Sequence, residues 1–469
     1  MNESNTLGQK LDSIDEYERE PVAEGKLQGW GKFLGLYAGE HVAGTEFVIG
    51  PLFVIHGVSA PDLFLGLFIG NILAVLSWAF LTAPIAVKTR LTMYWHLRRI
   101  VGSKVTIGYS LVNALMFCIL AGAMIAVAAT AIGLPLNMTM PGLDDFYPNS
   151  VEWVVVVFFV GAVVTILAIL GFEKISEFAK IASPWMFLLF IACGVSVLPT
   201  LGCESFGDFW RIANEKIWTG VPVEGQSKFT FWHIMVFSWL LNMAMHIGMS
   251  DMSILRYAKS WKQGFASASG MFLGHYVAWF ASGILSAAAL REITPGPIAY
   301  MGAGVIGVIG VVITSWTTAN PTLYRAGLAI QAASPNWKRW KVTLVAGVVT
   351  TLAACFPGFI MKFFEFLAIE GLVLMPIGVI IITDFWVLPR MNLKSNLAEV
   401  VKVTTNWAAL FAWLGTSVFC LVLIFVAEIE IFFVGIPGIA VASILYILSS
   451  KAYQKRFTQK SYNTENIPK

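Results

Sequence analysis

Three ionisable residues interrupt the first long apolar stretch of the sequence, which covers about residues 30–57. Glu40, His41 and Glu46 are spaced by glycines, and Pro51 follows them. A charged side chain at the centre of a bilayer costs about 2.5–3.5 kcal/mol even on the mildest scale. Backbone groups freed by glycine and proline are tolerated only inside protein or along a wet cavity. The pattern therefore predicts a broken helix whose polar groups line the path of a solute.

The two glutamates have a functional and a structural interpretation. Glu40 or Glu46 can bind an amino or amidine group of a solute, or carry a coupling proton. His41 and His246 titrate in a range that suits the same proton-coupling role. Alternatively, one glutamate pairs with His41, His246 or His275 in a structural polar cluster.

The composition is that of a membrane protein. Hydrophobic residues make up 57% of the chain and the mean hydropathy is +0.73, well above the range of soluble proteins. The sequence contains no P-loop, HExxH zinc motif or GxSxG elbow, so neither an enzyme nor an ATP-driven pump is expected. The net charge of +3 gives no reason to expect a nucleic-acid partner. The five cysteines form no CxxC pair that would suggest a metal site or a disulfide.

About twelve apolar runs are long enough to span a bilayer, which takes about 20 residues each. They predict an all-α polytopic membrane protein with a polar cytoplasmic tail at residues 1–29 and a second tail at residues 451–469. The expected spans, numbered in chain order, lie near residues 30–57, 62–87, 105–133, 151–171, 177–199, 229–250, 264–290, 299–320, 341–357, 360–388, 405–427 and 431–449.

The charges of the connecting loops alternate along the chain. Basic residues follow every even-numbered span, whereas the alternate loops are acidic, mixed or nearly uncharged. The positive-inside rule then places both termini in the cytoplasm and the protein in the cytoplasmic membrane. The basic residues are Lys88, Arg90, Arg98, Arg99, Lys104, Lys174, Lys180, Arg256, Lys259, Lys262, Arg325, Lys338, Arg339, Lys341, Arg390, Lys394, Lys402, Lys451, Lys455 and Arg456.

Span 6 is also interrupted, by Asn242, His246 and Gly248. Two polar, broken helices in corresponding positions of two halves are the best sequence indication of a transporter site built from inverted repeats. His246 has a structural alternative as a hydrogen bonder between packed helices. The expected parts are a first repeat at about residues 30–199, a second repeat at about residues 229–388 and two extra helices at about residues 405–449.

The end of span 8 is unusually polar, because four hydroxyls and one carboxamide fall within seven residues. They belong to Thr314, Ser315, Thr317, Thr318 and Asn320. Hydroxyl and carbonyl oxygens suit a hard monovalent cation, and the Asn320 amide can pair with a planar amide or amidine edge. Alternatively, the hydroxyls only join neighbouring helices within the bilayer.

Span 10 carries two further glutamates. Glu365 and Glu370 are five residues apart and therefore point to different faces of a helix. Lys362 lies one turn from Glu365, and a local ion pair between these two is the favoured interpretation.

Three motifs together resemble the nucleobase–cation symporter family, which includes purine, cytosine, allantoin and hydantoin permeases. The stretch from Ser315 to Gln331 is similar to that family's threonine and asparagine segment followed by a tyrosine and an AGL run. Residues 250–260 resemble its Asp…Arg-Tyr motif after span 6, and residues 364–386 resemble its span 10. With the span count, the resemblance covers about residues 30–450.

The resemblance implies a fold of five plus five inverted spans with two additional helices. It also implies a sodium ion between the break of span 1 and the hydroxyls of span 8. Thr314 and Ser315 are the expected side-chain ligands, and backbone carbonyls near Gly39 and Val42 complete the shell. Asn320 is then the amide that reads the solute.

The resemblance further implies a planar solute held between spans 3 and 6. In span 3, Asn113 matches the family's polar position, while the family's tryptophan is absent and Phe117 stands beside its place. In span 6, Trp239 is the only large indole near the site, and Asn242 is the alternative contact.

These observations favour a secondary active transporter that couples a Na⁺ or H⁺ gradient to the movement of a small polar planar solute, such as a nucleobase or a hydantoin. No cofactor other than the coupling ion is expected, and the oligomeric state stays open. An amino-acid or other small-solute symporter of the same fold, or a sensor without transport activity, is the alternative. The two glutamates beside the span 1 break would repel a carboxylate, which disfavours an amino acid.

Overall fold

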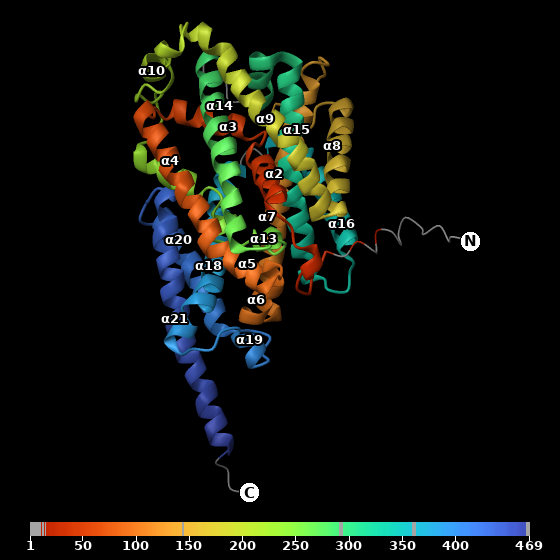
Figure 1. The fold of residues 1–469 in the computed structure, drawn as a ribbon, viewed down its shortest axis with the longest axis vertical. Helices are drawn as coiled ribbons and strands as arrows, with labels where there is room; N and C mark the ends of the chain where they lie inside the picture. Colours follow the sequence, from red (N-terminus) through yellow and green to blue (C-terminus); the bar gives the residue numbers. More distant parts are fainter. Residues whose placement is uncertain are drawn as a thin grey trace, which may run out of the picture.

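The described part of the chain is built from helices. The computed structural model describes residues 11, 14, 16–142, 145–289, 294–358 and 363–465, apart from the side chains at 363–368 and 457–465. Within these ranges no strand is formed, and nine helices are long and apolar enough to cross a membrane. The broken spans 1 and 6 and the 16-residue helix of span 9 complete the predicted series (Figure 1). The predicted all-α polytopic architecture is therefore confirmed.

The helices follow the predicted spans in order. The first repeat contains α2 (Trp30–His41), α3 (Glu46–Ile55), α4 (Ala60–Ser77), η2 (Trp78–Thr82), α5 (Ala83–Thr89), α7 (Ser103–Gly133), α8 (Val151–Leu170) and α9 (Phe172–Val197). The second contains α11 (Phe231–Leu240), α12 (Met243–His246), η7 (Ser269–Tyr276), α14 (Val277–Ala288), α15 (Pro295–Ala333), α16 (Arg339–Ala354) and α18 (Phe363–Trp386). The last two long helices are α20 (Trp407–Phe425) and α21 (Ile431–Glu465), and short connecting helices include α6 (Met93–Val101), α10 (Phe209–Ile212), α13 (Met252–Leu255) and α19 (Leu397–Val400).

Both predicted breaks are present. Span 1 divides into α2, which ends at His41, and α3, which begins at Glu46. Span 6 is helical to Leu240, is interrupted at Asn242 and continues only through the four-residue α12. Met249 then has a positive φ of 68°, a conformation that disfavours continuation of a helix. Each break frees backbone groups near the middle of the bundle.

The packing of the helices repeats between the two halves of the chain. Helix α3 of span 1 packs on α14 of span 7, as α11 of span 6 packs on α4 of span 2. Helix α2 packs on α9 of span 5, as α12 packs on α18 of span 10. At the centre α7 and α15 lie against each other, with α8 beside α7 and α16 beside α15. Each contact recurs when every helix is exchanged for its counterpart in the other repeat, as two repeats of five spans require.

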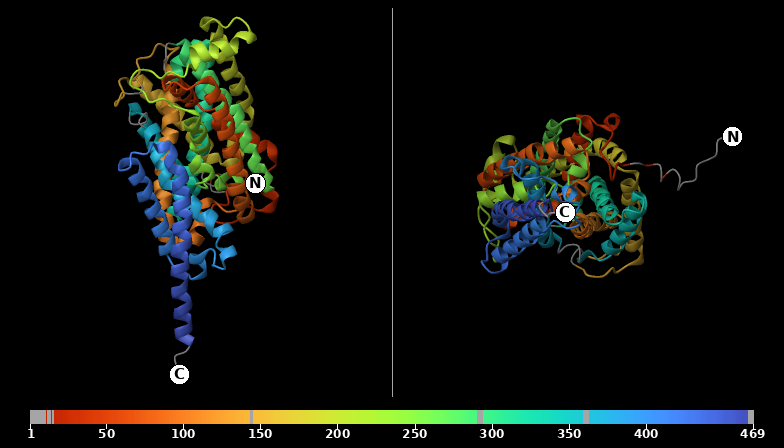
Figure 2. Two further views of the ribbon diagram at one scale, coloured as in Figure 1. Left: turned by 90° about the vertical axis from the view of Figure 1, so that its left-hand side faces the viewer. Right: turned by 90° about the horizontal axis from the view of Figure 1, so that it is seen from below.

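The last two helices lie outside this arrangement. Helices α20 and α21 pack on each other and on α18, along one side of the bundle, and α21 extends beyond the other helices (Figures 1 and 2). The end of the bundle that carries α6, α13 and α19 is called the basic end below, because its loops hold most of the basic residues. The opposite end carries α10 (Figure 1).

Candidate solute and cation site

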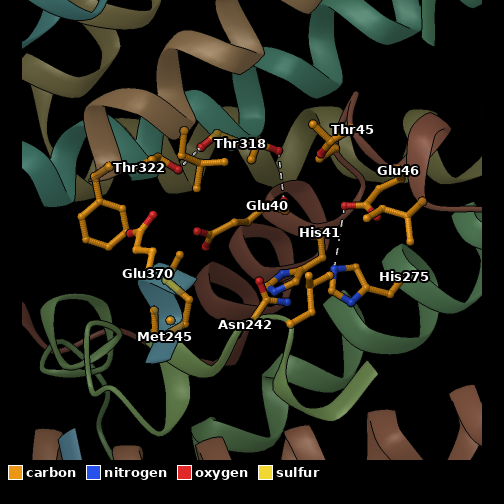
Figure 3. A pocket seen from close by; sticks show the side chains of 17 residues that line it. Glu40, His41, Thr45, Glu46, Asn242, Met245, His275, Thr318, Thr322 and Glu370 are labelled. Atoms are coloured by element: carbon orange, nitrogen blue, oxygen red, sulfur yellow. Dashed lines mark hydrogen bonds and ion pairs between the residues drawn. The ribbon is translucent and has the colours of Figure 1, made fainter. Parts of the chain in front are cut away.

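A small cavity lies between the two broken helices. Its volume is about 90 Å³, enough for several water molecules or a small solute. Side chains from both breaks, from α7, η7, α15 and α18 surround it (Figure 3). The lining residues are Glu40, His41, Ala43, Thr45, Glu46, Ile49, Phe117, Leu120, Leu241, Asn242, Ala244, Met245, His275, Thr318, Thr322, Glu370 and Gly371.

Glu40 belongs to a buried ion triad with Arg325 and Asp251, which lie behind the cavity wall. The Arg325 guanidinium donates from Nη1 to Glu40 Oε1 at 2.5 Å and from Nη2 to Glu40 Oε2 at 3.0 Å. The same Nη2 donates to Asp251 Oδ1 at 2.6 Å. Arg325 is fully buried, and the two carboxylates are almost so. Paired hydrogen bonds of this kind are the strong form of an ion pair, and they join α2, α15 and the segment before α13.

The second oxygen of Asp251 is also satisfied. Tyr37 donates its hydroxyl to Oδ2 at 3.1 Å, and Trp78 donates its indole N–H to the same atom at 2.5 Å. Tyr37 lies on α2, one turn before Glu40 and His41. The triad is therefore fixed by helices from both repeats.

Three arginines that the loop analysis assigned to basic connections are buried instead. Arg325 lies inside α15, which continues to Ala333, well past the predicted end of span 8. Arg256 donates to the backbone carbonyls of Glu16 and Tyr17, both at 2.6 Å. Arg339 donates to the carbonyls at the end of α8. Each is paired with acceptors inside the protein, so none of the three is a surface anchor.

A second polar cluster surrounds Glu46. The Trp279 indole donates to Glu46 Oε2, and His275 Nε2 lies 3.8 Å from Glu46 Oε1. The ring of His275 stacks on Trp279 with centroids 4.3 Å apart and meets the His41 ring edge-on at 4.8 Å. The structure thus brings Glu46 and His275 together, one of the pairings that the sequence leaves open.

The structure places five of the predicted solute or proton residues on the cavity wall. They are Glu40, His41, Glu46, Phe117 and Asn242. His41 Nε2 and Asn242 Nδ2 have no hydrogen-bond partner among the described residues. Phe117 also lies against Arg325, with the guanidinium carbon 5.9 Å from its ring centroid.

Four other predicted residues lie away from the wall. Asn113 accepts a hydrogen bond from Tyr94, Trp239 donates to Ser77 Oγ at 3.1 Å, and His246 contacts the carbonyl of Trp239 at 3.0 Å. Asn320 is buried, and its amide has no partner in the described part of the protein. The wall is instead lined by Thr318 and Thr322. Each is two residues from Asn320, so it lies on a different face of the helix.

Of the predicted cation ligands, Ser315 lies against the break of span 1. Ser315 Oγ is buried without a partner among the described residues. A Cβ placed on Gly44 would lie 2.6 Å from this oxygen, so the backbone of the break touches α15 there. Thr314 Oγ1 donates to the Val311 carbonyl at 3.0 Å.

The two predicted backbone ligands lie at the end of α2. Gly39 lies on α2 against α9 and α15, where a Cβ would meet Ser183 Oγ at 3.1 Å, and Val42 is the first residue after α2. No cluster of three His, Cys, Asp or Glu side chains suited to a metal occurs in the described ranges. A set of hydroxyl and carbonyl oxygens fits an alkali cation better than a transition metal.

Thr318, Thr322, His275 and Glu370 line the cavity but were not predicted as site residues. Glu370 comes from α18, is 6% exposed, and its Oε2 has no partner among the described residues. The side chains of Lys362 and Glu365, predicted to pair with each other, lie outside the described residues. Glu370 is five residues from Glu365, and this spacing indicated in the sequence that the two side chains point to different faces of the helix.

Comparisons with known proteins support the fold. No protein-family model matches the sequence, and no curated protein matches it. Among solved structures, Mhp1, described as a nucleobase-cation-symport-1 family transporter, in a closed conformation with bromovinylhydantoin bound, matches with a TM-score of 0.71 and 16% identity over 94% of this chain and 96% of that chain. The inward-facing conformation of Mhp1 matches with a TM-score of 0.69 and 15% identity over 97% and 96%.

A third structure shares the fold with a different solute. A Na⁺-coupled sialic acid symporter in a substrate-bound, outward-open state matches with a TM-score of 0.68 and 12% identity over 95% of this chain and 93% of that chain. The resemblance carried by the three motifs is thus confirmed at the level of the fold. At these sequence identities the comparison shows the architecture and does not identify the solute.

Proposed function

We propose that this protein is a secondary active transporter that moves a small polar solute across the cytoplasmic membrane together with a cation. The observation that carries this proposal is the cavity enclosed by two broken helices, which occupy equivalent places in the two repeats. Solute sites of inverted-repeat transporters form at such breaks, where freed backbone groups and half-helix ends are available to ligands. The symporters that share the fold support the same class of function.

We assign the coupling cation to the oxygens of Thr314 and Ser315 and to backbone carbonyls near Gly39 and Val42. The unpartnered Ser315 hydroxyl beside the break supports this assignment. A bound Na⁺ would then bridge α15 and the first broken helix, so that its binding favours one arrangement of these two elements. Proton coupling through Glu46 and His41 is the second possibility, supported by the buried Glu46–His275 contact.

The solute in this proposal is a small, polar, planar molecule, with a nucleobase or a hydantoin as the reference class. Phe117 offers a ring face on the cavity wall, and Asn242 offers an unpaired N–H. Stacking contributes on the order of 1–3 kcal/mol per ring. An amino acid is less favoured, because carboxyl groups from Glu40, Glu46 and Glu370 line the cavity.

The loop charges support an orientation with the basic end and both termini in the cytoplasm. In this orientation the cavity lies between the buried ion triad on the cytoplasmic side and α3 on the other side. The triad would have to open, or α2 would have to move with Asp251, before a solute could leave toward the cytoplasm.

The experiment is thermal unfolding of the purified full-length protein in detergent, with and without Na⁺, against nucleobases, hydantoins, allantoin, thiamine precursors and amino acids. A ligand that binds only the folded state raises the melting temperature, and the increase grows with the logarithm of its concentration above the Kd. We expect Na⁺ to stabilise the wild type relative to choline and Ser315→Ala to lose this effect. Ser417→Ala in α20 is the matched control. Stabilisation by amino acids alone would contradict the proposed solute class.

A further inference from the structure

The charged groups that line the cavity are all acidic. Glu40, Glu46 and Glu370 contribute carboxyl groups from three different elements, and the described part of the lining contains neither lysine nor arginine. Among the described residues, the only basic side chains on the wall are His41 and His275. The cavity wall is therefore a poor environment for an anion and a favourable one for a cation.

Arg325, which lies behind Glu40, cannot balance the charge of all these carboxyl groups. Arg325 binds Glu40 through two hydrogen bonds and Asp251 through a third. One guanidinium thus faces two carboxylates, and no positive charge of this triad is left for the other glutamates. Glu46 is held by the neutral indole of Trp279 and lies near His275.

Glu370 is the carboxyl group without a protein partner. It is 6% exposed, and its Oε2 accepts no hydrogen bond from any described residue. In Figure 3 the carboxyl groups of Glu370 and Glu40 point toward the same space. An unpaired buried carboxylate is costly, and a ligand that donates N–H groups to it removes that cost.

The surroundings of Glu370 fit a flat nitrogen cation. Phe117 lies on the same wall, with Met245 and Leu120 nearby, and a ring face attracts a cation within about 6 Å of its centroid. An amidinium or guanidinium group presents parallel N–H donors that match the two oxygens of a carboxylate. The hydroxyls of Thr318 and Thr322 donate to backbone carbonyls of α2 and α15, which leaves their oxygens available as acceptors.

We propose that the transported solute carries a small N–H cation of the amidinium or guanidinium type, bound by the Glu370 carboxylate in this cavity. The inference rests on the proposed transport function and narrows its solute class. Glu370 is the specificity-determining residue, because its Oε2 is buried without a partner among the described residues, whereas Glu40 is bound by Arg325 and Glu46 is held by Trp279 and lies near His275. Glu40 contributes to the acidic field and stays bound to Arg325.

The test uses three probes of nearly equal shape and different charge: acetamidinium, acetamide and acetate. Each is titrated into the purified full-length protein while thermal unfolding and binding heat are recorded. Acetamidinium is expected to raise the melting temperature and to give a saturable binding heat, and acetamide and acetate are expected to bind at least tenfold more weakly. Equal or stronger binding of acetamide or acetate would overturn the proposal.

The Glu370→Gln variant tests whether Glu370 is the residue that binds acetamidinium. Glutamine keeps the size of the side chain and removes its charge, and loss of an unpaired buried charge is not expected to unfold the protein. Acetamidinium affinity should fall at least tenfold in this variant and stay unchanged in Glu428→Gln, which replaces an exposed glutamate before α21. Unchanged acetamidinium affinity in Glu370→Gln would overturn the assignment.

Two outcomes separate this inference from the proposed function. If Na⁺ and a neutral nucleobase or hydantoin stabilise the protein and acetamidinium does not, the inference fails and the symporter proposal stands. If acetamidinium binds through Glu370 but neither a Na⁺ nor a proton gradient drives its uptake into proteoliposomes, the binding site stands and the symporter proposal fails.

Discussion

Arg325 and Glu40 form two nearly parallel hydrogen bonds between α15 and the first half of the broken helix, at 2.5 and 3.0 Å. With Asp251 at 2.6 Å on the same guanidinium, this pair connects the cavity wall to the basic end. One buried cation therefore joins α2, α15 and the segment before α13.

Removing that cation should destabilise the protein strongly. Arg325→Ala leaves two buried carboxylates without a counter-ion, and breaking a buried pair in this way costs about 3–5 kcal/mol. Thermal unfolding in detergent should show a clear loss of stability. Arg390→Ala is the matched control, because Arg390 is exposed and donates to the backbone carbonyl of Trp386. Equal melting temperatures for the two variants would argue against a structural role for the triad.

The proposed cation site can be disturbed from the backbone side. A methyl group at Gly44 would lie 2.6 Å from Ser315 Oγ and 3.4 Å from the Val311 carbonyl, so Gly44→Ala should push the break away from α15. We expect the apparent affinity for Na⁺, measured from the stabilisation that Na⁺ gives, to fall at least tenfold. Gly108→Ala in α7 is the control, since nothing lies within 4 Å of a Cβ there. Wild-type Na⁺ affinity in Gly44→Ala would place the ion elsewhere.

The role of Glu46 can be read from the pH dependence of transport. Glu46→Gln keeps an acceptor for the Trp279 indole and removes the charge that faces His275. If this carboxyl group carries the coupling proton, uptake into proteoliposomes should lose its dependence on external pH. The exposed Glu428→Gln provides the comparison. A wild-type pH profile in Glu46→Gln would reduce Glu46 to a structural partner of His275 and Trp279.

The fold could be predicted because its signals are local. The spans follow from apolar length, and the two breaks follow from glycine, proline and polar residues placed where lipid would be. The cost of burying charge also explains why Glu40, His41 and Glu46 were singled out, and all three line the cavity.

The partners of these residues could not be predicted, because they are distant in the chain. Arg325 lies 285 residues from Glu40 and 74 from Asp251, and an arginine near a span end has the same sequence signature whether it is buried or exposed. The rotation of α15 about its axis is likewise set by packing, so that Thr318 and Thr322 line the cavity and Asn320 does not. The motif similarity located the polar segment of α15, but it could not show which of its side chains face the cavity.

The segment before span 1 is tied to the basic end by Glu16. Its carboxylate accepts hydrogen bonds from the hydroxyls of Tyr257 at 2.9 Å and Tyr324 at 2.8 Å, and from the backbone N–H of Phe172 at 3.2 Å. Glu16→Ala removes the acceptor of the Tyr324 hydroxyl and of the Phe172 N–H, while Tyr257 keeps the Glu16 backbone carbonyl, and the loss should cost about 1–3 kcal/mol. Thermal unfolding of Glu16→Ala against the exposed Glu20→Ala measures the difference. Equal stability would mean that the segment is not fastened by this carboxylate.

Acid should destabilise the protein through His96, on the short helix α6 that connects spans 2 and 3. Burial, together with the nearby Arg99 guanidinium, lowers the pKa of His96 to about 4. Both ring nitrogens lack partners among the described residues, so the buried ring is favoured in its neutral form. The stabilising effect is present above the unfolded pKa of about 6.5 and is lost as the pH falls toward 4, because the unfolded state takes up the proton first.

The corresponding measurement compares the wild type with His96→Leu at pH 7 and pH 4.5. The fall of the His96 pKa from about 6.5 in the unfolded chain to about 4 in the folded protein corresponds to about 3 kcal/mol of unfolding free energy across this pH range. Other groups titrate in the same range, but their effect is common to both proteins, so the difference between the two melting curves isolates His96. We expect the wild type to lose more stability than His96→Leu on acidification. An identical loss in the two proteins would show that the His96 ring becomes protonated in the folded state without cost.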